Sequence, residues 1–456
     1  MSTSRTASIG FYGGVGSVTG ANFLLDTGSL RIIVDCGLEQ GGEFSLQKNA
    51  EPFPYDPASA DILIVTHAHA DHIGRIPKLV REGFKGKIYS TTPTKDLAGI
   101  MLHDACAIMK HEAEMSGTAP LYKEADIGQA LALWTTMSYH DSFTLGDVTV
   151  TFYDAGHILG SALVLFERDG KRLMFTGDIG NVPQPLLNPP EIVKDLDYLL
   201  MESVYGNRLH EQVAERASIL LAEIKSTIAK KGTLIIPAFS LERTQGMLFE
   251  INNFVESGMI DAIPVFLDSP LAIAVTDIYR AHRAYLKDSV RARIEGGDDI
   301  FDFPKLSYTR TREASDAISK IPGPKIIIAG SGMSHGGRVL AHEIEYLGRR
   351  DTTLLLVGYQ TVGSVGRLLQ DGVSRVTIDG VPVRVKARIQ TIQGYSGHAD
   401  RDQLIEFVAE RGEKLKKVFV TMGEERASLF LVQRLRDYLG VDAIAPEAHQ
   451  VISIDF

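Results

Sequence analysis

The feature that most constrains this chain is residues 61–72, an apolar run, "DILIV", that leads into "HAHADH". The apolar run predicts a short buried strand, and in extended backbone His67 and His69 project to the same side. Asp71 and His72 then fall in the expected first turn of a helix. Ionisable groups crowded at the end of a buried strand destabilise one another unless a cation compensates them, which a divalent metal does most directly. The alternative is a set of solvated loop histidines without a shared partner.

Three further candidates lie far along the chain in a similar context, a short strand followed by a glycine-containing turn. They are His157 in "DAGHILGSA", Asp178 in "FTGDIG" and His398 in "GYSGHADR". Glycines let the backbone bend closely around a site. Each residue alone could be an ordinary loop residue, but together with residues 67–72 they become further candidate ligands.

Strand and helix patterns alternate along the chain, which predicts an α/β protein. In the first part, short strands alternate with helical periodicity at 94–112 and 124–136. The middle follows a helix, strand, helix order typical of parallel βαβ units, with a long helical run at 271–296. Short strands return near the end.

A length of 456 residues is too great for one ordinary core and predicts two domains, or one domain that carries a large insertion. The change of texture favours an inserted domain. The expected segments are a first domain at 1–206, an insertion at 207–370, and the C-terminal part of the first domain at 371–456.

Composition narrows the environment and the type of metal ligand. The hydrophobic share of 44% and charged share of 23% are those of soluble globular proteins. The chain has no apolar stretch near 20 residues and no secretory signal at its start, so we expect a cytoplasmic protein without a membrane span. Cys36 and Cys106 are too few for a thiolate zinc site, which leaves nitrogen and oxygen ligands. A net charge of -10 argues against unspecific nucleic-acid binding but permits a localised basic cleft.

On these residues the chain resembles the metallo-β-lactamase superfamily and, within it, the β-CASP nucleases, relatives of the cleavage and polyadenylation endonuclease. Asp35 in "IIVDCG" matches the first motif, "HAHADH" the second, His157 the third and Asp178 the fourth. "MESVYGNR" with Glu202 and "SGHAD" with His398 match motifs that flank the inserted domain. The resemblance implies an αββα sandwich carrying an inserted β-CASP domain.

The resemblance also implies two zinc ions, although the same ligand types would accept Mn²⁺ or Fe²⁺. The ligands of the first zinc would be His67, His69 and His157. Those of the second would be Asp71, His72 and His398, with Asp178 bridging the two ions.

Other groups would act beside the metals. By resemblance, Asp35 orients ligands or the attacking water, and Glu202 fixes the tautomer of His398. Many family members supply a further histidine before "SGHAD" to protonate the leaving oxygen. Residues 358–397 contain no histidine, so the chain departs from that pattern. The remaining possibilities are His335, a metal-bound water, or reduced or altered activity.

Substrate contacts are expected in the insertion. "GSGMSHGG" offers backbone N–H groups near a helix start, a natural cradle for phosphate. The candidate residues are Ser331, Gly332, Met333, Arg338 and Arg243.

The predicted function is metal-dependent hydrolysis of RNA phosphodiester bonds, as an endonuclease or a 5′–3′ exonuclease, in RNA processing or decay. RNA is the expected partner, and a homodimer is possible. Two alternatives stay open: a dinuclear-metal hydrolase of a small ester or thioester, and a catalytically silent RNA-binding scaffold.

Overall fold

The computed structural model describes residues 6–41, 44–210, 213–358, 360–361, 363–412 and 414–456. The chain divides into two compact units. The first comprises Met1–Val182, Asn188–Leu209 and His398–Phe456, and the second comprises Pro183–Leu187 and His210–Gly397.

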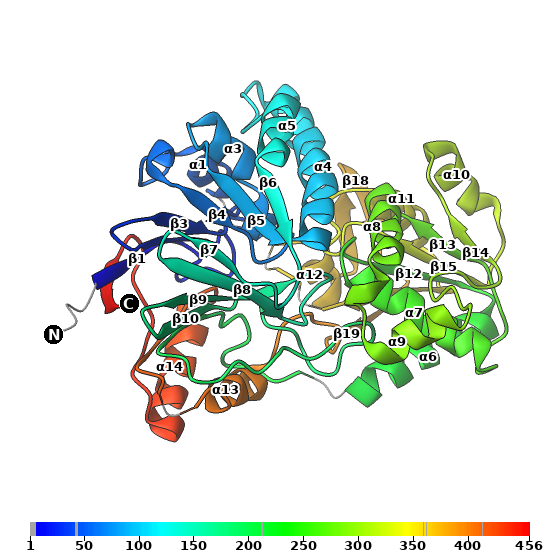
Figure 1. The fold of residues 1–456 in the computed structure, drawn as a ribbon. Helices are drawn as coiled ribbons and strands as arrows, with labels where there is room; N and C mark the ends of the chain where they lie inside the picture. Colours follow the sequence, from blue (N-terminus) through cyan, green and yellow to red (C-terminus); the bar gives the residue numbers. More distant parts are fainter. Residues whose placement is uncertain (1–5, 42–43, 211–212, 359, 362, 413) are drawn as a thin grey trace. The chain divides into compact units, whose positions relative to one another are not determined.

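Two seven-stranded sheets form the first unit (Figure 1). In sheet order, the strands of the first sheet are β22 (Val451–Asp455), β1 (Thr6–Gly13), β2 (Asn22–Asp26), β3 (Arg31–Val34), β4 (Ile62–Ile64), β5 (Lys87–Thr91) and β6 (Trp134–Met137). Those of the second are β21 (Ala443–Ile444), β20 (Lys417–Val420), β11 (Tyr198–Met201), β10 (Lys171–Phe175), β9 (Ala162–Arg168), β8 (Val148–Asp154) and β7 (Phe143–Leu145). Each sheet is parallel at one end and antiparallel at the other.

The main core of this unit joins residues of the two sheets, because one apolar face of each is buried against the other. Phe11 and Phe23 from the first sheet belong to the same cluster as Phe152 and Phe166 from the second. A separate cluster joins the other face of the second sheet to two C-terminal helices, with Leu199 and Leu431 among its members.

Helices cover the outer faces of the sheets. Figure 1 shows α4 and α5 lying along β5 and β6. The helices of this unit are α1 (Ser45–Ala50), α2 (Ala70–Ile73), α3 (Ile76–Arg81), α4 (Thr92–Ser116), α5 (Glu124–Ala132), α13 (Arg401–Ala409) and α14 (Glu425–Leu439). The layer order of helix, sheet, sheet, helix confirms the predicted αββα sandwich.

The second unit is a six-stranded, wholly parallel sheet flanked by helices. Its strands, in sheet order, are β14 (Leu306–Tyr308), β13 (Val265–Asp268), β15 (Lys325–Ala329), β12 (Thr233–Pro237), β16 (Thr352–Val357) and β19 (Arg388–Ile392). Its helices are α6 (Val213–Lys230), α7 (Arg243–Glu256), α8 (Pro270–Ala281), α9 (Asp288–Glu295), α10 (Arg312–Ala317), α11 (Val339–Tyr346) and α12 (Val365–Gln370). A hairpin of β17 (Arg375–Ile378) and β18 (Val381–Arg384) completes it.

Two expected helices differ from what the periodicity indicated. The helix expected at 124–136 stops at Ala132, since Trp134 begins β6, pairs with β5 and donates its indole N–H to Ser90 Oγ at 2.8 Å. The run expected at 271–296 is broken between α8 and α9, where Leu286 adopts extended backbone and is buried.

The end of the insertion also differs from the boundary expected at residue 371. The chain returns to the first unit only at His398. The physical reason is that β19 pairs with β16 and completes the sheet of the second unit, while Val376 and Val383 enter its core. Short strands in this segment resembled the first domain in texture but belong to the second unit.

Within the described part of the chain, no helix combines the length and the apolar character needed to cross a membrane.

Candidate metal centre

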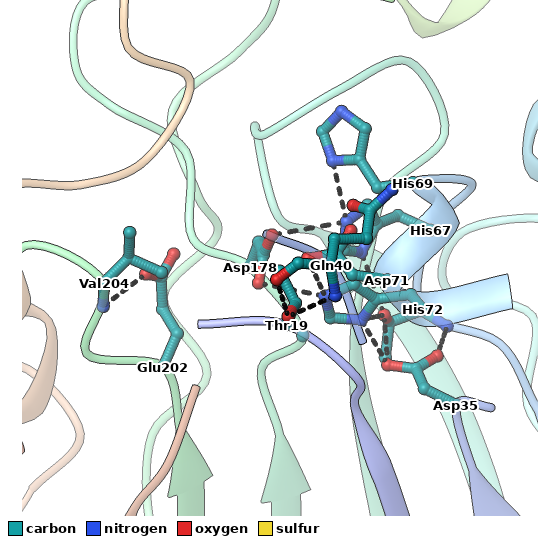
Figure 2. Close-up of polar contacts among 12 residues, drawn as sticks. Thr19, Asp35, Gln40, His67, His69, Asp71, His72, Asp178, Glu202 and Val204 are labelled. Carbon is teal, nitrogen blue, oxygen red and sulfur yellow. Dashed lines mark hydrogen bonds and ion pairs between the residues drawn. The ribbon is translucent and has the colours of Figure 1, made fainter. Parts of the chain in front are cut away.

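His67, His69, His157 and Asp178 come together in the first unit, in turns that follow β4, β8 and β10. Figure 2 shows His67, His69, Asp71, His72 and Asp178 close together. His69 is the N-cap residue of α2, so Asp71 and His72 lie in the first turn of a helix, as expected. His398 reaches the same place through an isolated bridge with Gly180, and Ala399 N donates to Ile179 O at 2.8 Å.

Four side chains form a compact ligand set, His67, His69, His157 and Asp178. His69 Nδ1 lies 3.1 Å from His67 Nε2 and 3.1 Å from His157 Nε2. Asp178 Oδ2 lies 3.4 Å from each of those two Nε2 atoms. Ligands bound tetrahedrally to zinc stand about 3.3 Å apart, as follows from metal–ligand distances near 2.0–2.1 Å. The four distances are therefore close to those expected between ligands that share one ion, and all four atoms lie within 4.8 Å of one another.

A second set forms around the other oxygen of Asp178. His72 Nε2 lies 3.3 Å from Asp178 Oδ1 and 4.0 Å from Asp71 Oδ2. Both His72 Nε2 and Asp178 Oδ1 are buried without a hydrogen-bond partner, which is uncommon in folded proteins. Two such atoms facing each other are suited to share a cation.

His398 contacts the other oxygen of Asp178: its Nδ1 lies 3.7 Å from Asp178 Oδ2. His398 groups with Asp178 and Glu202. Among the described residues, the ligand atoms of Asp71, His72 and His398 do not form one compact set. Their predicted sharing of a second ion stays a prediction.

Asp35 holds His72 in the tautomer that binds a metal. His72 Nδ1 lies 2.7 Å from Asp35 Oδ2, so a neutral His72 ring keeps its proton on Nδ1 and has Nε2 as the acceptor. Asp35 also accepts hydrogen bonds from Thr66, from N to Oδ1 and from Oγ1 to Oδ2, each at 2.8 Å. Asp35 has a φ of 60°, a backbone conformation uncommon outside glycine and found often at functional sites.

Glu202 stands beside His398 in the way the sequence predicted. Its Oε1 lies 3.2 Å from His398 Nδ1 and accepts the backbone N–H of Ile179 at 2.7 Å. Its Oε2 accepts the N–H of Val204 at 3.2 Å, and the side chain is fully buried (Figure 2). Because its oxygens are fixed by backbone groups, Glu202 can set the orientation of the His398 ring.

The electrostatics of the centre call for positive charge. Burial lowers the pKa of His67 and His69, and neighbouring imidazoles lower it further. Burial alone would lower the pKa of His72, but the carboxylates of Asp178 and Asp35 raise it well above its ordinary value. Without a metal, the proton on His72 therefore offsets the buried carboxylates, and metal binding would displace protons.

Two glycines allow the turns to meet. A Cβ at Gly37 would lie 1.5 Å from Asp71 O, and one at Gly177, whose φ is 53°, would lie 2.6 Å from Thr66. Larger residues at these positions would push the turn after β3 and the turn after β10 away from "HAHADH".

The predicted substrate residues lie in the second unit. Ser331, Gly332 and Met333 lie in the loop between β15 and α11. His335 is an exposed residue of the same loop, and its backbone N–H donates to Ser331 Oγ at 3.0 Å. Roles of this loop in RNA binding or proton transfer stay predictions.

The two predicted arginines are engaged within the protein. Arg338 bonds Asp268 Oδ1 and Thr309 O, each at 2.7 Å. Arg243 donates to Val357 O at 3.2 Å and stacks 4.4 Å from the centroid of Phe239. These contacts give both guanidinium groups a structural role that their sequence positions did not reveal.

Sequence reasoning missed Thr66, which lies within the metal-binding stretch itself. Its hydroxyl group donates to Asp35 Oδ2 at 2.8 Å and lies 3.0 Å from Nδ1 of His67. The available signal was its position, because a residue between a buried strand and the first ligand necessarily lies beneath the metal site.

Comparison with protein families agrees with this geometry. Residues 24–200 match the metallo-beta-lactamase superfamily domain, and residues 244–369 match the Beta-Casp domain. Residues 382–446 match the Zn-dependent metallo-hydrolase RNA specificity domain.

Characterised relatives match along nearly the whole chain. Ribonuclease TTHA0252 of Thermus thermophilus is 34% identical, over 92% of this chain and 94% of its own length. An RNase J-like protein of Methanocaldococcus jannaschii is 30% identical, over 97% of this chain and 99% of its own. The transcription termination factor FttA of Methanosarcina mazei is 31% identical, over 95% of this chain and 69% of its own.

A solved structure of a protein of unknown function from Enterococcus faecalis V583 has a TM-score of 0.59, with 98% of this chain and 100% of that chain covered. At 12% sequence identity, this similarity shows the fold alone. The sequence matches to the relatives have higher identity over nearly the whole chain, and they identify the family. They show that the chain belongs to the β-CASP family of the metallo-β-lactamase superfamily, whose members bind divalent metal ions.

Proposed function

We propose that this protein is a metal-dependent ribonuclease that hydrolyses RNA phosphodiester bonds, as an endonuclease or a 5′–3′ exonuclease, in RNA processing or decay. The observation that carries the proposal is the convergence of His67, His69, His157 and Asp178, with neighbouring ligand atoms 3.1–3.4 Å apart. Relatives named as a ribonuclease and an RNase J-like protein, and the matching RNA specificity domain, support RNA as the polymer.

Zinc is the metal proposed for both positions, since imidazole and carboxylate ligands suit it, although Mn²⁺ and Fe²⁺ accept the same ligands. Bound divalent ions would lower the pKa of a water molecule and stabilise charge on the phosphoryl oxygens. Asp35 accepts from Nδ1 of His72, so that Nε2 is the nitrogen that would bind a metal once its proton is displaced, and Glu202 holds the ring of His398. These contacts would orient both rings for an ion.

Contacts with RNA are proposed for the loop of Ser331, Gly332 and Met333 in the second unit. The backbone N–H groups of such a loop can bind phosphate without reading the base. His335 is the group of this loop that could donate a proton to the leaving oxygen, because it is an exposed histidine.

We further propose a cytoplasmic location and a homodimer. The two cysteines, Cys36 and Cys106, are both free, which fits a reducing compartment. Twofold-symmetric dimers are the commonest oligomers of soluble proteins. Fractionation of cells and light scattering of the purified protein test these two statements.

The deciding experiment combines metal analysis of the purified protein with digestion of RNA labelled at either end, carrying 5′ monophosphate, triphosphate or hydroxyl groups. We expect stoichiometric divalent metal and cleavage that a chelator abolishes. Binding should weaken steeply as salt rises, because phosphate contacts release counterions.

Two results would reject the proposal. Hydrolysis of small esters that RNA does not inhibit would favour the small-molecule hydrolase. Stoichiometric metal without cleavage of any RNA would favour the silent scaffold.

A further inference from the structure

The metal ligand His157 belongs to a turn, residues 155–161, that has little regular structure of its own. It joins β8 to β9, and the ligand sits in its middle. Nε2 of His157 approaches His69 Nδ1 to 3.1 Å, so the backbone beneath it must be fixed to a few tenths of an ångström. The question is what fixes it.

Ser161 acts at the centre of the turn. Its buried Oγ accepts the backbone N–H of His157 at 3.1 Å and that of Ile158 at 3.2 Å. One hydroxyl group therefore satisfies two buried donors, one of them belonging to the ligand itself. A hydroxyl oxygen has two lone pairs, so Ser161 Oγ can accept both hydrogen bonds at once.

Asp154 acts where the turn begins. Its Oδ1 accepts the backbone N–H of Gly156 at 2.8 Å, and the residue is 8% exposed. Gly156 has a φ of 63°, and a Cβ there would lie 2.4 Å from Asn188 O. The side chain of Asp154 thus stabilises a left-handed residue in a crowded place, directly before His157.

Asp154 is itself held in place by Glu191. The backbone N–H of Asp154 donates to Glu191 Oε1 at 2.8 Å, and the N–H of Glu191 donates to Asp154 O at 2.9 Å. This reciprocal pair fixes the start of the turn independently of the strand pairing of β8 with β9.

The far end of the turn is anchored from the first sheet and its helix. The hydroxyl groups of Thr91 and Thr94 donate to Gly160 O at 2.6 and 2.9 Å. Tyr139 donates its hydroxyl proton to Ser161 O at 2.7 Å. Side chains therefore bind the turn at its start, its centre and its end.

The turn also contacts the loop of the bridging carboxylate. Gly180 N donates to Ala155 O at 2.9 Å, and a Cβ at Gly180 would lie 2.1 Å from Gly156 O. A displacement of Gly156 would therefore move the loop that carries Asp178 as well as His157.

We propose that Asp154 and Ser161 are positioning residues for the first metal ion: they fix the backbone of His157 and, through Gly156, the loop of Asp178. The inference rests on the proposed metal-dependent function but concerns metal affinity, which is measured separately from RNA cleavage.

The experiment compares Ser161→Ala, Asp154→Ala and Asp154→Asn with the wild type. Zn²⁺ is titrated into metal-free protein in competition with a chromogenic chelator, and the visible spectrum of Co²⁺-loaded protein reports ligand geometry. We expect Ser161→Ala and Asp154→Ala to weaken Zn²⁺ binding at the site of His157 about tenfold, near the lower end for groups that support metal ligands. Asp154→Asn should stay within about twofold of the wild type, because its amide oxygen still accepts the N–H of Gly156.

Thr151→Val is the matched control, since Thr151 is a buried residue of β8 whose hydroxyl group bonds Ser142 at 2.8 Å, outside the turn. It should bind Zn²⁺ as the wild type does, with a similar loss of thermal stability. Excess metal should restore cleavage by Ser161→Ala, as a purely structural defect would not allow.

Equal affinities in Ser161→Ala, Asp154→Ala and Thr151→Val would overturn the inference. If Ser161→Ala fails to fold, the pair Asp154→Ala and Asp154→Asn decides: equal affinities in this pair reject positioning by the carboxylate. A wild type that binds zinc but cleaves no RNA, with the affinities in the expected order, would reject the proposed function and support the positioning role.

Discussion

Two buried carboxylates, one in each unit, show how the same residue type can have a structural role in one place and face a candidate metal site in another. Asp268 at the end of β13 receives Arg338 and Thr309 on Oδ1, and His342 and Ser315 on Oδ2. Asp178 at the metal centre faces imidazole nitrogens, and its Oδ1 has no hydrogen-bond partner.

The two carboxylates differ in what compensates their negative charge. At Asp268 the protein provides two side-chain partners for each oxygen, together with the charge of an arginine. The carboxylate therefore needs no ligand to compensate its charge. At Asp178 the surrounding nitrogens are acceptors once they are deprotonated, so only an added cation completes the cluster. An Asp–His contact alone does not identify a metal site; the convergence of several imidazoles on one carboxylate distinguishes Asp178 from Asp268.

The largest expected effect is that of Asp178→Ala, which removes a ligand atom from both sets. We expect bound metal to fall below stoichiometric amounts and RNA cleavage to drop more than about a hundredfold, beyond what loss of a supporting group causes. Thermal unfolding should show a folded protein, since the apolar core between the sheets is untouched. Elemental analysis and cleavage assays measure the change.

The control for this substitution is Asp61→Ala, at an exposed residue of the same unit whose carboxylate accepts Arg31 N at 2.8 Å. It should keep its metal and its activity. Full activity in an Asp178→Ala protein verified to lack metal would contradict the contrast between the two carboxylates.

Asp268→Ala should show the reverse pattern, with stability lost and metal kept. Removing the carboxylate leaves Arg338 and His342 without their partner, at an expected cost of about 3–5 kcal/mol in the free energy of unfolding. Denaturant titration followed by circular dichroism measures it. Asp277→Ala, at an exposed carboxylate of α8 that pairs with Arg280, should cost about 0–1 kcal/mol.

A loss of metal from Asp268→Ala while the protein stays folded would show that Asp268 also supports the metal centre. The separation of structural and metal-binding carboxylates would then be wrong.

The sequence reveals these two clusters unequally. Six positions of "HAHADH" contain four ligand candidates, so local density alone predicted the metal site. The partners of Asp268 are scattered over more than seventy positions, from Asp268 to His342, and none stands in a recognisable pattern. The bond between Arg338 and Asp268 was therefore not foreseen, and the expected contact of Arg338 with RNA stays a prediction.

The fold class was predictable for a similar reason, because strand and helix periodicities are local. The end of the insertion was not, since assigning β19 to the second unit depends on its pairing with β16. Pairing between distant strands leaves no trace in the periodicity of either one.

A third prediction tests support behind the metal centre, through Asp35→Asn. Asp35 accepts three hydrogen bonds, from Thr66 N, Thr66 Oγ1 and His72 Nδ1. An asparagine has a single acceptor oxygen, so either Thr66 or His72 faces an amide N–H instead. We expect metal affinity to fall about 10–100-fold, with little change in melting temperature. Chelator competition measures the affinity, and an unchanged value would reject the role of Asp35 in fixing the His72 tautomer.

The smallest expected effect comes from the protonation of Asp268, which changes the free energy of unfolding only in acid. Burial alone would raise the pKa of Asp268, but hydrogen bonds from His342, Ser315, Thr309 and Arg338 lower it well below the ordinary value of about 3.9. A carboxyl group with a lowered folded-state pKa stabilises the fold above its unfolded-state pKa and loses that contribution as the pH falls through the folded-state value.

The free energy of unfolding should therefore decline more steeply below about pH 4 in the wild type than in Asp268→Asn, which cannot take up this proton. Denaturant titrations between pH 7 and pH 3 on metal-free proteins isolate this contribution from that of the metal centre. Parallel curves for the two proteins would mean that the donors around Asp268 do not favour its charged form, and the contrast with Asp178 would then rest on geometry alone.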